Sequence, residues 1–324
     1  MARSIGRIPA SRAKLLAWYR RRRRDLPWRR RGDAYAIWVS EIMLQQTRVA
    51  AVIPYYERFL CRFPDVGTLA RARENTVLAH WSGLGYYRRA RFLHAAARVV
   101  VREGVPQTAE GWRALPGVGE YTAAAVASIA FGEPIAVVDG NVERVLSRMH
   151  RIESDKRAVK AAAQAWVSRR SPGDHNQAVM ELGATVCTPR APRCDRCPVR
   201  AFCGGQAEPD RYPAPRARPK TVRKRRSVAF VVRAGKVKLV RNDQGTLLRG
   251  MWRLPDAEPG EAKDSVLLGR VAHSVLHKRI TLSIYGGPAS EPGQWFGPKK
   301  AAALPLTAAA RKCLKQVGFF PIAG

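Results

Sequence analysis

The stretch Leu115–Asn141, LPGVGEYTAAAVASIAFGEPIAVVDGN, constrains the fold of this chain more than any other. Gly117 and Gly119 permit a tight turn, and without Cβ atoms they let a ligand approach the backbone closely. The alanine-rich run Tyr121–Phe131 predicts a buried helix directly after the turn, which the following glycine and proline end. Because the first amides of a helix are unpaired, this turn is a ready anion site.

Asp139 follows a short apolar run and precedes a helical pattern of apolar residues. It therefore stands at the entrance of the next helix. One interpretation is an N-cap, because Asp is a favoured cap. The other is a catalytic carboxylate, which the order of glycine turn, helix and acid favours.

Glu41 lies inside the strongly apolar segment Ile37–Val52, which predicts one helix. It is either a first-turn acid that interacts favourably with the helix dipole, or a carboxyl in a low-dielectric pocket with a raised pKa. The run Arg20–Arg24 likewise allows a solvated helix face or a phosphate-contacting flank.

The charge of the chain indicates a polyanionic partner. Its 324 residues, enough for two domains, carry 58 Lys+Arg against 25 Asp+Glu, a formal net charge of +33. A genome that favours Arg codons would raise the same number, so charge alone indicates affinity and not function. Apolar runs of about 18 residues and a signal-peptide core are missing, and we expect a soluble cytoplasmic protein with no membrane partner.

Four of the six cysteines lie within one loop, Cys187-x6-Cys194-x2-Cys197-x5-Cys203. In a cytosolic chain this clustering indicates a metal site and not disulfides. Four thiolates can hold a [4Fe-4S] cluster or a zinc ion. Arginines interleave with the cysteines, which favours a loop that binds the phosphates of a polyanionic partner over a catalytic redox centre.

The segment Trp38–Thr47, WVSEIMLQQT, resembles the N-terminal signature of the MutY-type adenine DNA glycosylases, of the helix-hairpin-helix superfamily. Leu26–Arg29 precedes it at the family's distance, and Gly83–Tyr87, GLGYY, resembles a family loop that lies against DNA. The hairpin and Asp139–Val145 follow, so the resemblance covers residues 25–203.

This resemblance implies a mainly α N-terminal region over residues 1–203, with two helical subdomains, a helix-hairpin-helix at about 110–132 and an iron-sulfur loop at 187–203. The cysteine spacing matches the family's cluster loop, which makes [4Fe-4S] the expected cofactor and zinc a minor alternative.

The resemblance also assigns catalytic roles. Glu41 would protonate adenine at N7, Asp139 would stay ionised beside C1′, and Asn141 and Tyr121 would support Asp139 and the sugar. Endonuclease III-type enzymes carry a lysine where Tyr121 stands, and a phenol cannot form their Schiff base. We therefore expect a monofunctional glycosylase.

Further residues match DNA-contacting positions of the family. Gln46 and Tyr87 would enter the base stack, and Thr47 would contact the base opposite adenine. The adenine pocket would include Trp28, Arg29 and Glu181. Tyr86 belongs to the loop against DNA, and Gly117 and Gly119 would fix a phosphate.

Residues 204–226 are rich in Gly, Pro and basic residues and predict a linker. Residues 227–324 resemble the Nudix-like domain of the family, a small α+β unit with a hairpin around Ala234-Gly235, a strand at Ile280–Tyr285 and a helix at Leu306–Val317. A Glu-rich metal-binding helix is missing from the sequence, so we expect this domain to bind and not to hydrolyse.

One motif departs from the family. Val275-Leu276-His277 stands where the family has Phe-Ser-His for recognition of 8-oxoguanine, and only the His matches. Sites built on hydrogen bonds discriminate more than apolar ones, so the strictness for 8-oxoguanine stays open.

The expected function is hydrolysis of the N-glycosidic bond of adenine opposite 8-oxoguanine or guanine, by a monomer on duplex DNA in the cytoplasm at the nucleoid. One alternative is a glycosylase with another target base, and a second is a non-catalytic iron-sulfur DNA-binding protein. A redox role of the cluster, protein partners and a covalent Asp139 intermediate stay open.

Overall fold

A computed structural model describes residues 7–215, 221–243, 248–257, 265–275 and 277–320. The chain forms two compact units, one of residues 1–60, 65–67 and 95–217 and the other of residues 61–64, 68–94 and 218–324. The division differs from the predicted boundaries, because residues 68–94 of the expected helical region cluster with the C-terminal part of the chain.

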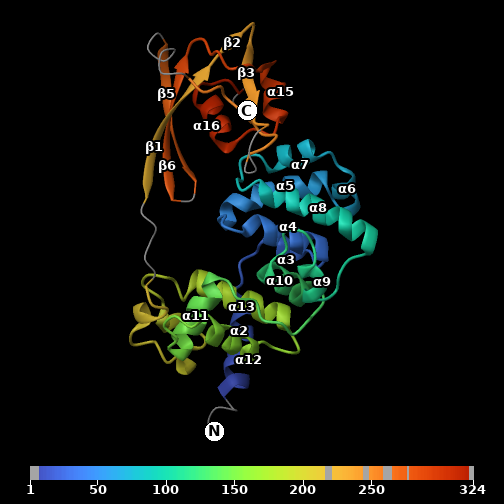
Figure 1. The fold of residues 1–324 in the computed structure, drawn as a ribbon. Helices are drawn as coiled ribbons and strands as arrows, with labels where there is room; N and C mark the ends of the chain where they lie inside the picture. Colours follow the sequence, from blue (N-terminus) through green and yellow to red (C-terminus); the bar gives the residue numbers. More distant parts are fainter. Residues whose placement is uncertain (1–6, 216–220, 244–247, 258–264, 276, 321–324) are drawn as a thin grey trace. The chain divides into compact units, whose positions relative to one another are not determined.

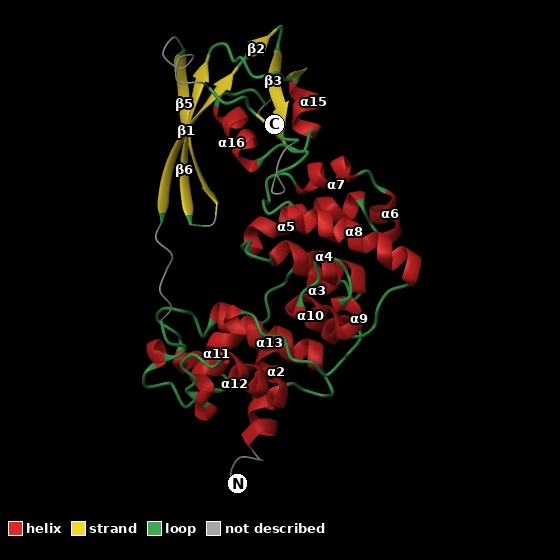
Figure 2. Ribbon diagram, in the orientation of Figure 1, coloured by secondary structure: helices red, strands yellow, loops and turns green. Residues whose placement is uncertain are grey.

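The first unit is helical, as predicted (Figure 2). Its helices are α2 (Arg7–Arg22), α3 (Pro27–Arg30), α4 (Ala34–Leu44), α5 (Val49–Arg62), α9 (Ala109–Arg113), α10 (Glu120–Ala130), α11 (Gly140–His150), α12 (Lys156–Trp166) and α13 (Pro172–Thr185). Short 3-10 turns follow at η1 (Cys194–Arg196), η2 (Arg200–Phe202) and η3 (Pro209–Arg211). Helices α6 (Val66–Arg71) and α8 (Arg88–Glu103) have residues in both units, and so does α5, whose last two residues belong to the second unit.

The apolar spacing of the sequence builds the core of this unit. Helix α11 begins at its N-cap Asp139, whose side chain accepts a hydrogen bond from Val142 N. Its buried Val145 and Leu146 belong to a core that also includes residues of α2, α12 and α13, and Trp166 of α12 is one of them. Both the helix and its capping acid are therefore confirmed.

The predicted single helix over Ile37–Val52 is wrong. Helix α4 ends at Leu44, and α5 starts at Val49. Gln46 between them adopts a left-handed conformation, with φ 56°, which interrupts helical hydrogen bonding. Because apolar residues keep their helical spacing on both sides of the break, their pattern alone does not reveal it.

The second unit combines helix α7 (Glu74–Trp81) and the start of α8 with two small sheets (Figures 1 and 2). Its strands are β1 (Val222–Phe230), β2 (Val232–Arg233), β3 (Lys236–Arg241), β4 (Trp252–Arg253), β5 (Val266–Val275), β6 (Lys278–Gly286) and β7 (Gln294–Phe296). In one sheet β6 lies between β1, which is parallel to it, and the antiparallel β5. In the other, β3 pairs antiparallel with β2, β4 and β7.

Helices α15 (Pro298–Ala303) and α16 (Ala308–Gln316) pack on these strands around a core that includes Leu239, Ile284 and Leu314. The predicted hairpin is confirmed between β2 and β3, where Ala234 and Gly235 both have positive φ. The strand and the helix predicted after it correspond to β6 and α16.

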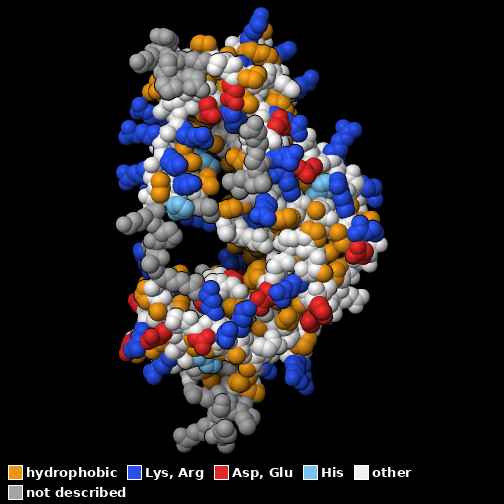
Figure 3. Space-filling view, viewed as in Figure 1, with side chains coloured by type: hydrophobic (Ala, Val, Ile, Leu, Met, Phe, Trp, Pro, Cys, Tyr) orange, Lys and Arg blue, Asp and Glu red, His pale blue; other side chains and the backbone are white. Residues whose placement is uncertain are grey.

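The predicted linker is shorter than expected, because β1 begins at Val222. Part of the linker, residues 216–220, lies outside the described residues. Basic side chains gather on the side of the second unit that carries β1 (Figure 3). They include four consecutive exposed residues, Arg223, Lys224, Arg225 and Arg226. Among the described helices, none is long and apolar enough to cross a membrane.

Candidate active site

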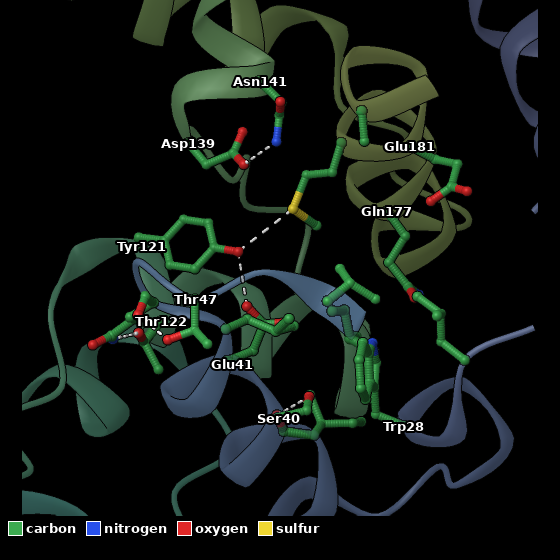
Figure 4. A pocket seen from close by; sticks show the side chains of 18 of the residues that line it. Trp28, Ser40, Glu41, Thr47, Tyr121, Thr122, Asp139, Asn141, Gln177 and Glu181 are labelled. Carbon is green, nitrogen blue, oxygen red and sulfur yellow. Dashed lines mark hydrogen bonds between the residues drawn. The ribbon is translucent and has the colours of Figure 1, made fainter. Parts of the chain in front are cut away.

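A cavity of about 640 Å³ lies in the first unit (Figure 4). Side chains of α3, α4, α10, α11 and α13 line it, together with the turn between α4 and α5. Glu41 and Asp139, the two predicted catalytic carboxyls, both face this space although 98 positions separate them in the chain. The fold therefore brings together the two acids that the sequence singled out.

Glu41 has a desolvated environment. It lies on α4, where the flanking residues are also buried, and its own exposed fraction is 5%. Burial, as the largest cause, raises the pKa of Glu41 to about 7, since water no longer solvates the charge. The nearby Asp139 raises the pKa further, whereas the hydrogen bond from Tyr121 and the charge of Arg29 lower it. Glu41 can therefore hold a proton near neutral pH.

Tyr121 stands between the two acids on the first turn of α10 (Figure 4). Its hydroxyl donates to Glu41 Oε2 at 2.8 Å and lies 3.5 Å from Met180 Sδ. Burial raises the pKa of Tyr121 well above its ordinary value, and the charges of Glu41 and Asp139 add to the rise. The phenol therefore stays a neutral donor.

Asp139 is held by two donors. Its Oδ1 accepts from Val142 N at 2.7 Å, and its Oδ2 accepts from Asn141 Nδ2 at 2.9 Å. A carboxylate beside a carboxyl of raised pKa forms an acid and anion pair.

The side chain of Asn141 is held in turn by a hydrogen bond from Arg144. Arg144 Nη2 donates to Asn141 Oδ1 at 2.9 Å and to Gly183 O at 2.8 Å, and Arg144 Nε donates to Cys187 O at 2.8 Å. A Cβ at Gly183 would lie 2.6 Å from Asn141 Cβ, so the close approach of α13 to α11 requires glycine there. Arg144 and Gly183 were not predicted as site residues, because one belongs to an ordinary helix pattern and the other to a contact between helices.

Glu181 of α13 also lines the cavity (Figure 4). Arg24 Nε and Nη2 donate to its two oxygens at 2.7 and 2.9 Å, and Arg29 Nη2 donates at 2.9 Å. Burial acts to raise the pKa of Glu181, but the hydrogen bonds and charges of the two arginines overcome it and hold the pKa below its ordinary value. Trp28 also lines the cavity, is buried and packs edge-on against Tyr56, with ring centres 5.5 Å apart. Within the predicted run Arg20–Arg24, the structure thus gives Arg24 a specific anionic partner.

The break between α4 and α5 presents polar residues to the cavity. Gln46 and Thr47 line it, and Thr47 Oγ1 donates to Gln45 O at 3.2 Å. Gln45, which was not predicted, donates through Nε2 to Thr122 Oγ1 at 3.1 Å and ties this turn to α10.

The glycine turn before α10 has two different glycines. Gly117 has φ 74°, a conformation that favours glycine. Gly119 has φ −90° and is the N-cap of α10, and a Cβ there would meet nothing within 4 Å. Neither backbone conformation nor protein packing requires glycine at residue 119, which leaves room for a ligand at this helix start.

All four predicted metal-binding cysteines line one apolar cavity beside α11 and α13. Arg148 reaches the same loop, with Nη1 3.4 Å from Cys187 Sγ and 2.7 Å from Thr188 O. Within the described ranges, no group of three or more His, Cys, Asp or Glu side chains is arranged to hold a single metal ion. Four thiolates that line one space are the donor set of a [4Fe-4S] cluster.

The remaining predicted residues belong to the second unit. Tyr86 is 39% exposed, but Tyr87 is 4% exposed and donates through its hydroxyl to Leu306 O at 3.2 Å. The ring of Tyr87 is thus packed inside the unit, and its insertion into a base stack stays a prediction. His277 is exposed between β5 and β6, whereas its neighbour Leu276 lies outside the described residues.

Two family models match the chain. Residues 39–169 match the HhH-GPD superfamily of base excision DNA repair proteins, and residues 187–203 match the iron-sulfur binding domain of endonuclease III.

Relatives and solved structures agree with these matches. The chain is 49% identical over 219 residues to an adenine DNA glycosylase of Homo sapiens, with 62% of this chain and 40% of the relative covered. It is 38% identical over 301 residues to an adenine DNA glycosylase of Arabidopsis thaliana, with coverages of 78% and 48%. The match thus spans less than half the length of these relatives. A thermostable thymine-DNA glycosylase structure is similar with a TM-score of 0.59 and 28% identity over 63% of this chain and 99% of that one.

Proposed function

Residues 39–169 belong to the HhH-GPD superfamily of base excision DNA repair proteins, and from this premise we propose that the chain is a DNA glycosylase that removes adenine. The observation that carries the proposal is the pair of carboxyls in one cavity: Glu41 with a pKa of about 7, and Asp139 held by two donors. Cleavage of a base from its sugar needs these two states, an acid for the leaving group and an anion for the sugar.

The reaction follows from these two groups. Protonated Glu41 gives its proton to N7 of a flipped adenine, and the N9–C1′ bond breaks with its electron pair leaving on adenine. The carboxylate of Asp139 stabilises the positive charge that develops at C1′. Water then attacks C1′, and ionised Glu41 accepts the proton that the water loses. The sum is adenine plus an abasic site, with Glu41 again protonated.

Tyr121 supports a monofunctional enzyme. Its phenol lacks the amine that would form a Schiff base with the opened sugar. In its place, a neutral hydroxyl fixes the orientation of Glu41 at 2.8 Å. Base removal therefore proceeds without an intrinsic strand-cleavage step.

Cys187, Cys194, Cys197 and Cys203 bind a [4Fe-4S] cluster in this loop. When bound, the cluster supplies a rigid cross-link of a segment otherwise built of 3-10 turns. In the proposed role, the loop's arginines contact phosphates, and Arg144 holds Asn141 against the same loop through Cys187 O.

Duplex DNA is the proposed partner. The net charge of +33 supports it, and so does the open helix start at Gly119, where backbone amides can donate hydrogen bonds to a phosphate. In Gly119→Ala, the added methyl group occupies this space, and we expect about tenfold weaker duplex binding with little change in stability. Gly297→Ala is the control, because Gly297 is also an extended N-cap with nothing near its Cβ position. Equal affinities of the two variants would argue against the phosphate site.

The proposed substrate is adenine opposite 8-oxoguanine or guanine, bound by a monomer at the nucleoid in the cytoplasm. In the first unit, Thr47 is the proposed contact to the base opposite adenine, and Gln46 is the residue proposed to enter the base stack. In the second unit, exposed His277 is the proposed contact to 8-oxoguanine. The family's Nudix-like domain is the proposed counterpart of residues 227–324. Val275 in place of the family's aromatic weakens the case for strict 8-oxoguanine recognition.

A second candidate is removal of a different base. Similarity to a thymine-DNA glycosylase structure supports this alternative. Single-turnover excision decides between them, on duplexes with adenine opposite 8-oxoguanine, guanine, cytosine and thymine and one with thymine opposite guanine. We expect excision from the first two. Excision of thymine alone would favour the second candidate, and no excision from any adenine duplex by cluster-loaded protein would refute the removal of adenine.

A further inference from the structure

The loop Gly83–Tyr87 of the second unit has an unusual backbone. Gly83 and Gly85 have φ of 105° and 80°, and Tyr86 has φ 50°. A tyrosine seldom adopts this left-handed conformation, so its surroundings must hold it there. Tyr86 is nevertheless 39% exposed, which makes it a strained aromatic side chain presented to solvent.

Both ends of the loop are fixed to one carbonyl group. Ser82 Oγ donates to Leu306 O at 2.7 Å, and Tyr87 Oη donates to the same oxygen at 3.2 Å. Ser82 and Tyr87 are 5% and 4% exposed, so water does not compete for these bonds. Gly83 N also lies 3.4 Å from Tyr87 Oη as a donor. The two residues that bracket Tyr86 are therefore joined through Leu306.

Arg311 of α16 completes this arrangement. Its Nε and Nη2 donate to Ser82 Oγ at 3.2 and 3.1 Å. A hydroxyl has one proton and two lone pairs, so Ser82 can donate to Leu306 while it accepts from Arg311. We call Ser82, Tyr87, Leu306 and Arg311 the Leu306 clamp.

The sheet and helix of the C-terminal segment hold the Leu306 clamp in place. Trp252 N donates to Pro305 O at 2.9 Å, and Thr307 N donates to Trp252 O at 2.9 Å. Thr307 also caps α16, which carries Arg311. The carbonyl of Leu306 thus lies between two backbone bonds to β4 and a helix start.

A second set of hydrogen bonds, next to the loop, connects α8 to the C-terminal segment. Arg91 of α8 donates through Nε to Glu74 Oε1 at 3.0 Å and through Nη2 to the carbonyl of Arg249. Arg89 lies 5.2 Å from the ring centre of Tyr86 and 5.6 Å from that of Trp81. Tyr86 therefore stands against a guanidinium group on a helix that is itself tied to the C-terminal segment.

We propose that the C-terminal segment acts in base removal through the Leu306 clamp, which positions Tyr86 for insertion beside the mispair. The inference rests on the proposed glycosylase function, because it takes duplex DNA as the partner. Tyr86 is the residue that touches DNA, and Arg311 is a positioning residue that acts through it. A stacked aromatic ring offsets part of the cost of flipping a base.

A double-mutant cycle tests this coupling. The full-length, cluster-loaded protein is measured for affinity to a duplex with 2′-fluoro-deoxyadenosine, which resists cleavage, opposite 8-oxoguanine. We expect Tyr86→Ala and Arg311→Gln each to bind about tenfold more weakly, and the double variant to bind no more weakly than Tyr86→Ala. Fluorescence of 2-aminopurine next to the mispair should report the same loss of unstacking in all three.

Lys315→Gln is the matched control, because it removes a positive charge from the same helix at an exposed position. We expect its duplex affinity to differ from that of the wild type by less than twofold. Tyr87→Phe keeps the ring and removes the hydrogen bond to Leu306 O, so it should also weaken duplex binding. This variant tests the Leu306 clamp independently if Arg311→Gln fails to fold.

Additive losses of about a hundredfold in the double variant would overturn the Leu306 clamp and leave a glycosylase that excises adenine untouched. Absence of excision by the wild-type protein would overturn the proposed function, while the affinity cycle would still report the coupling. Full affinity in Tyr86→Ala would overturn the clamp whatever the excision result.

Discussion

Glu41 and Glu181 show how one residue type takes opposite states in one cavity. Both line the same space, and their exposed fractions are 5% and 1%. The pKa of Glu41 is raised to about 7, mainly by burial, whereas the pKa of Glu181 is lowered because Arg24 and Arg29 overcome the effect of burial.

The difference lies in the partners that each backbone element supplies. Helix α4 surrounds Glu41 with apolar residues and leaves the neutral hydroxyl of Tyr121 as a donor. Glu181 meets two guanidinium groups from the α2–α3 region, at 2.7 and 2.9 Å. Burial without a hydrogen-bonded cation makes an acid, and burial with two hydrogen-bonded cations makes a structural anion. The proposed chemistry needs the first state, and the shape of the pocket wall depends on the second.

Among substitutions that remove the difference between the two glutamates, we expect the largest loss of excision rate from a change at Glu41. Glu41→Gln keeps size and burial but cannot deliver the proton, so the single-turnover excision rate should fall by about 10² to 10⁴. Duplex affinity should stay within about threefold of the wild type, which separates chemistry from binding. A rate within tenfold of the wild type would show that Glu41 is not the acid.

Asp139→Asn removes the anion that faces Glu41 and keeps a capping side chain. We expect a rate loss of about 10² to 10³, because electrostatic stabilisation at C1′ is lost. The melting temperature should hardly change, since Asn caps a helix about as well as Asp. Thermal unfolding and excision are measured on the same preparation. A large drop in stability with little loss of rate would support the capping role alone.

The sequence predicted the helical region, the capping acid and the membership of both carboxyls in one site, because these depend on local pattern and on motif resemblance. It did not predict the break at Gln46, since a left-handed glutamine leaves no trace in apolar spacing. The roles of Arg24 and Arg144 were also missed. Both depend on contacts with residues 157 and 39 positions away, Glu181 and Gly183.

The loop Gly83–Tyr87 also has features that the sequence alone did not predict. Two adjacent tyrosines are indistinguishable by motif, and only tertiary packing separates exposed Tyr86 from buried Tyr87. The grouping of residues 68–94 with the C-terminal part likewise depends on distant contacts such as that between Ser82 and Leu306. Amino-acid composition predicts neither the different burial of the two tyrosines nor this grouping.

Stability should respond to the two glutamates with opposite signs. Glu181→Gln leaves Arg24 and Arg29 with a weaker partner, and we expect a loss of about 2 kcal/mol, below the range for a fully buried pair because Arg24 is 41% exposed. Glu41→Gln should stabilise the protein at pH 8. Chemical unfolding at pH 5 and pH 8 measures both.

The sign for Glu41 follows from linkage. Its pKa of about 7 in the folded protein lies above the ordinary 4.5, so the folded state keeps a proton that the unfolded state loses. Stability from this group is present below pH 4.5 and declines as the pH rises to about 7, by up to about 3 kcal/mol. Glu41→Gln lacks this decline, so its advantage over the wild type should grow between pH 5 and pH 8. A constant difference would contradict a raised pKa.

Tyr121→Phe should have the smallest effect on the excision rate. It tests how far the hydrogen bond from Tyr121 offsets the rise that burial causes in the pKa of Glu41. In the wild type the excision rate should be level below about pH 7 and fall tenfold per pH unit above it, because the protonated acid is needed. The hydrogen bond from Tyr121 lowers the pKa of Glu41, so its removal should move this midpoint to higher pH. Below the midpoint the rate should fall by less than about tenfold, the size expected for one neutral hydrogen bond. A midpoint that moves to lower pH would mean that Tyr121 stabilises the protonated form, and the contrast between Glu41 and Glu181 would then rest on more than burial and charge.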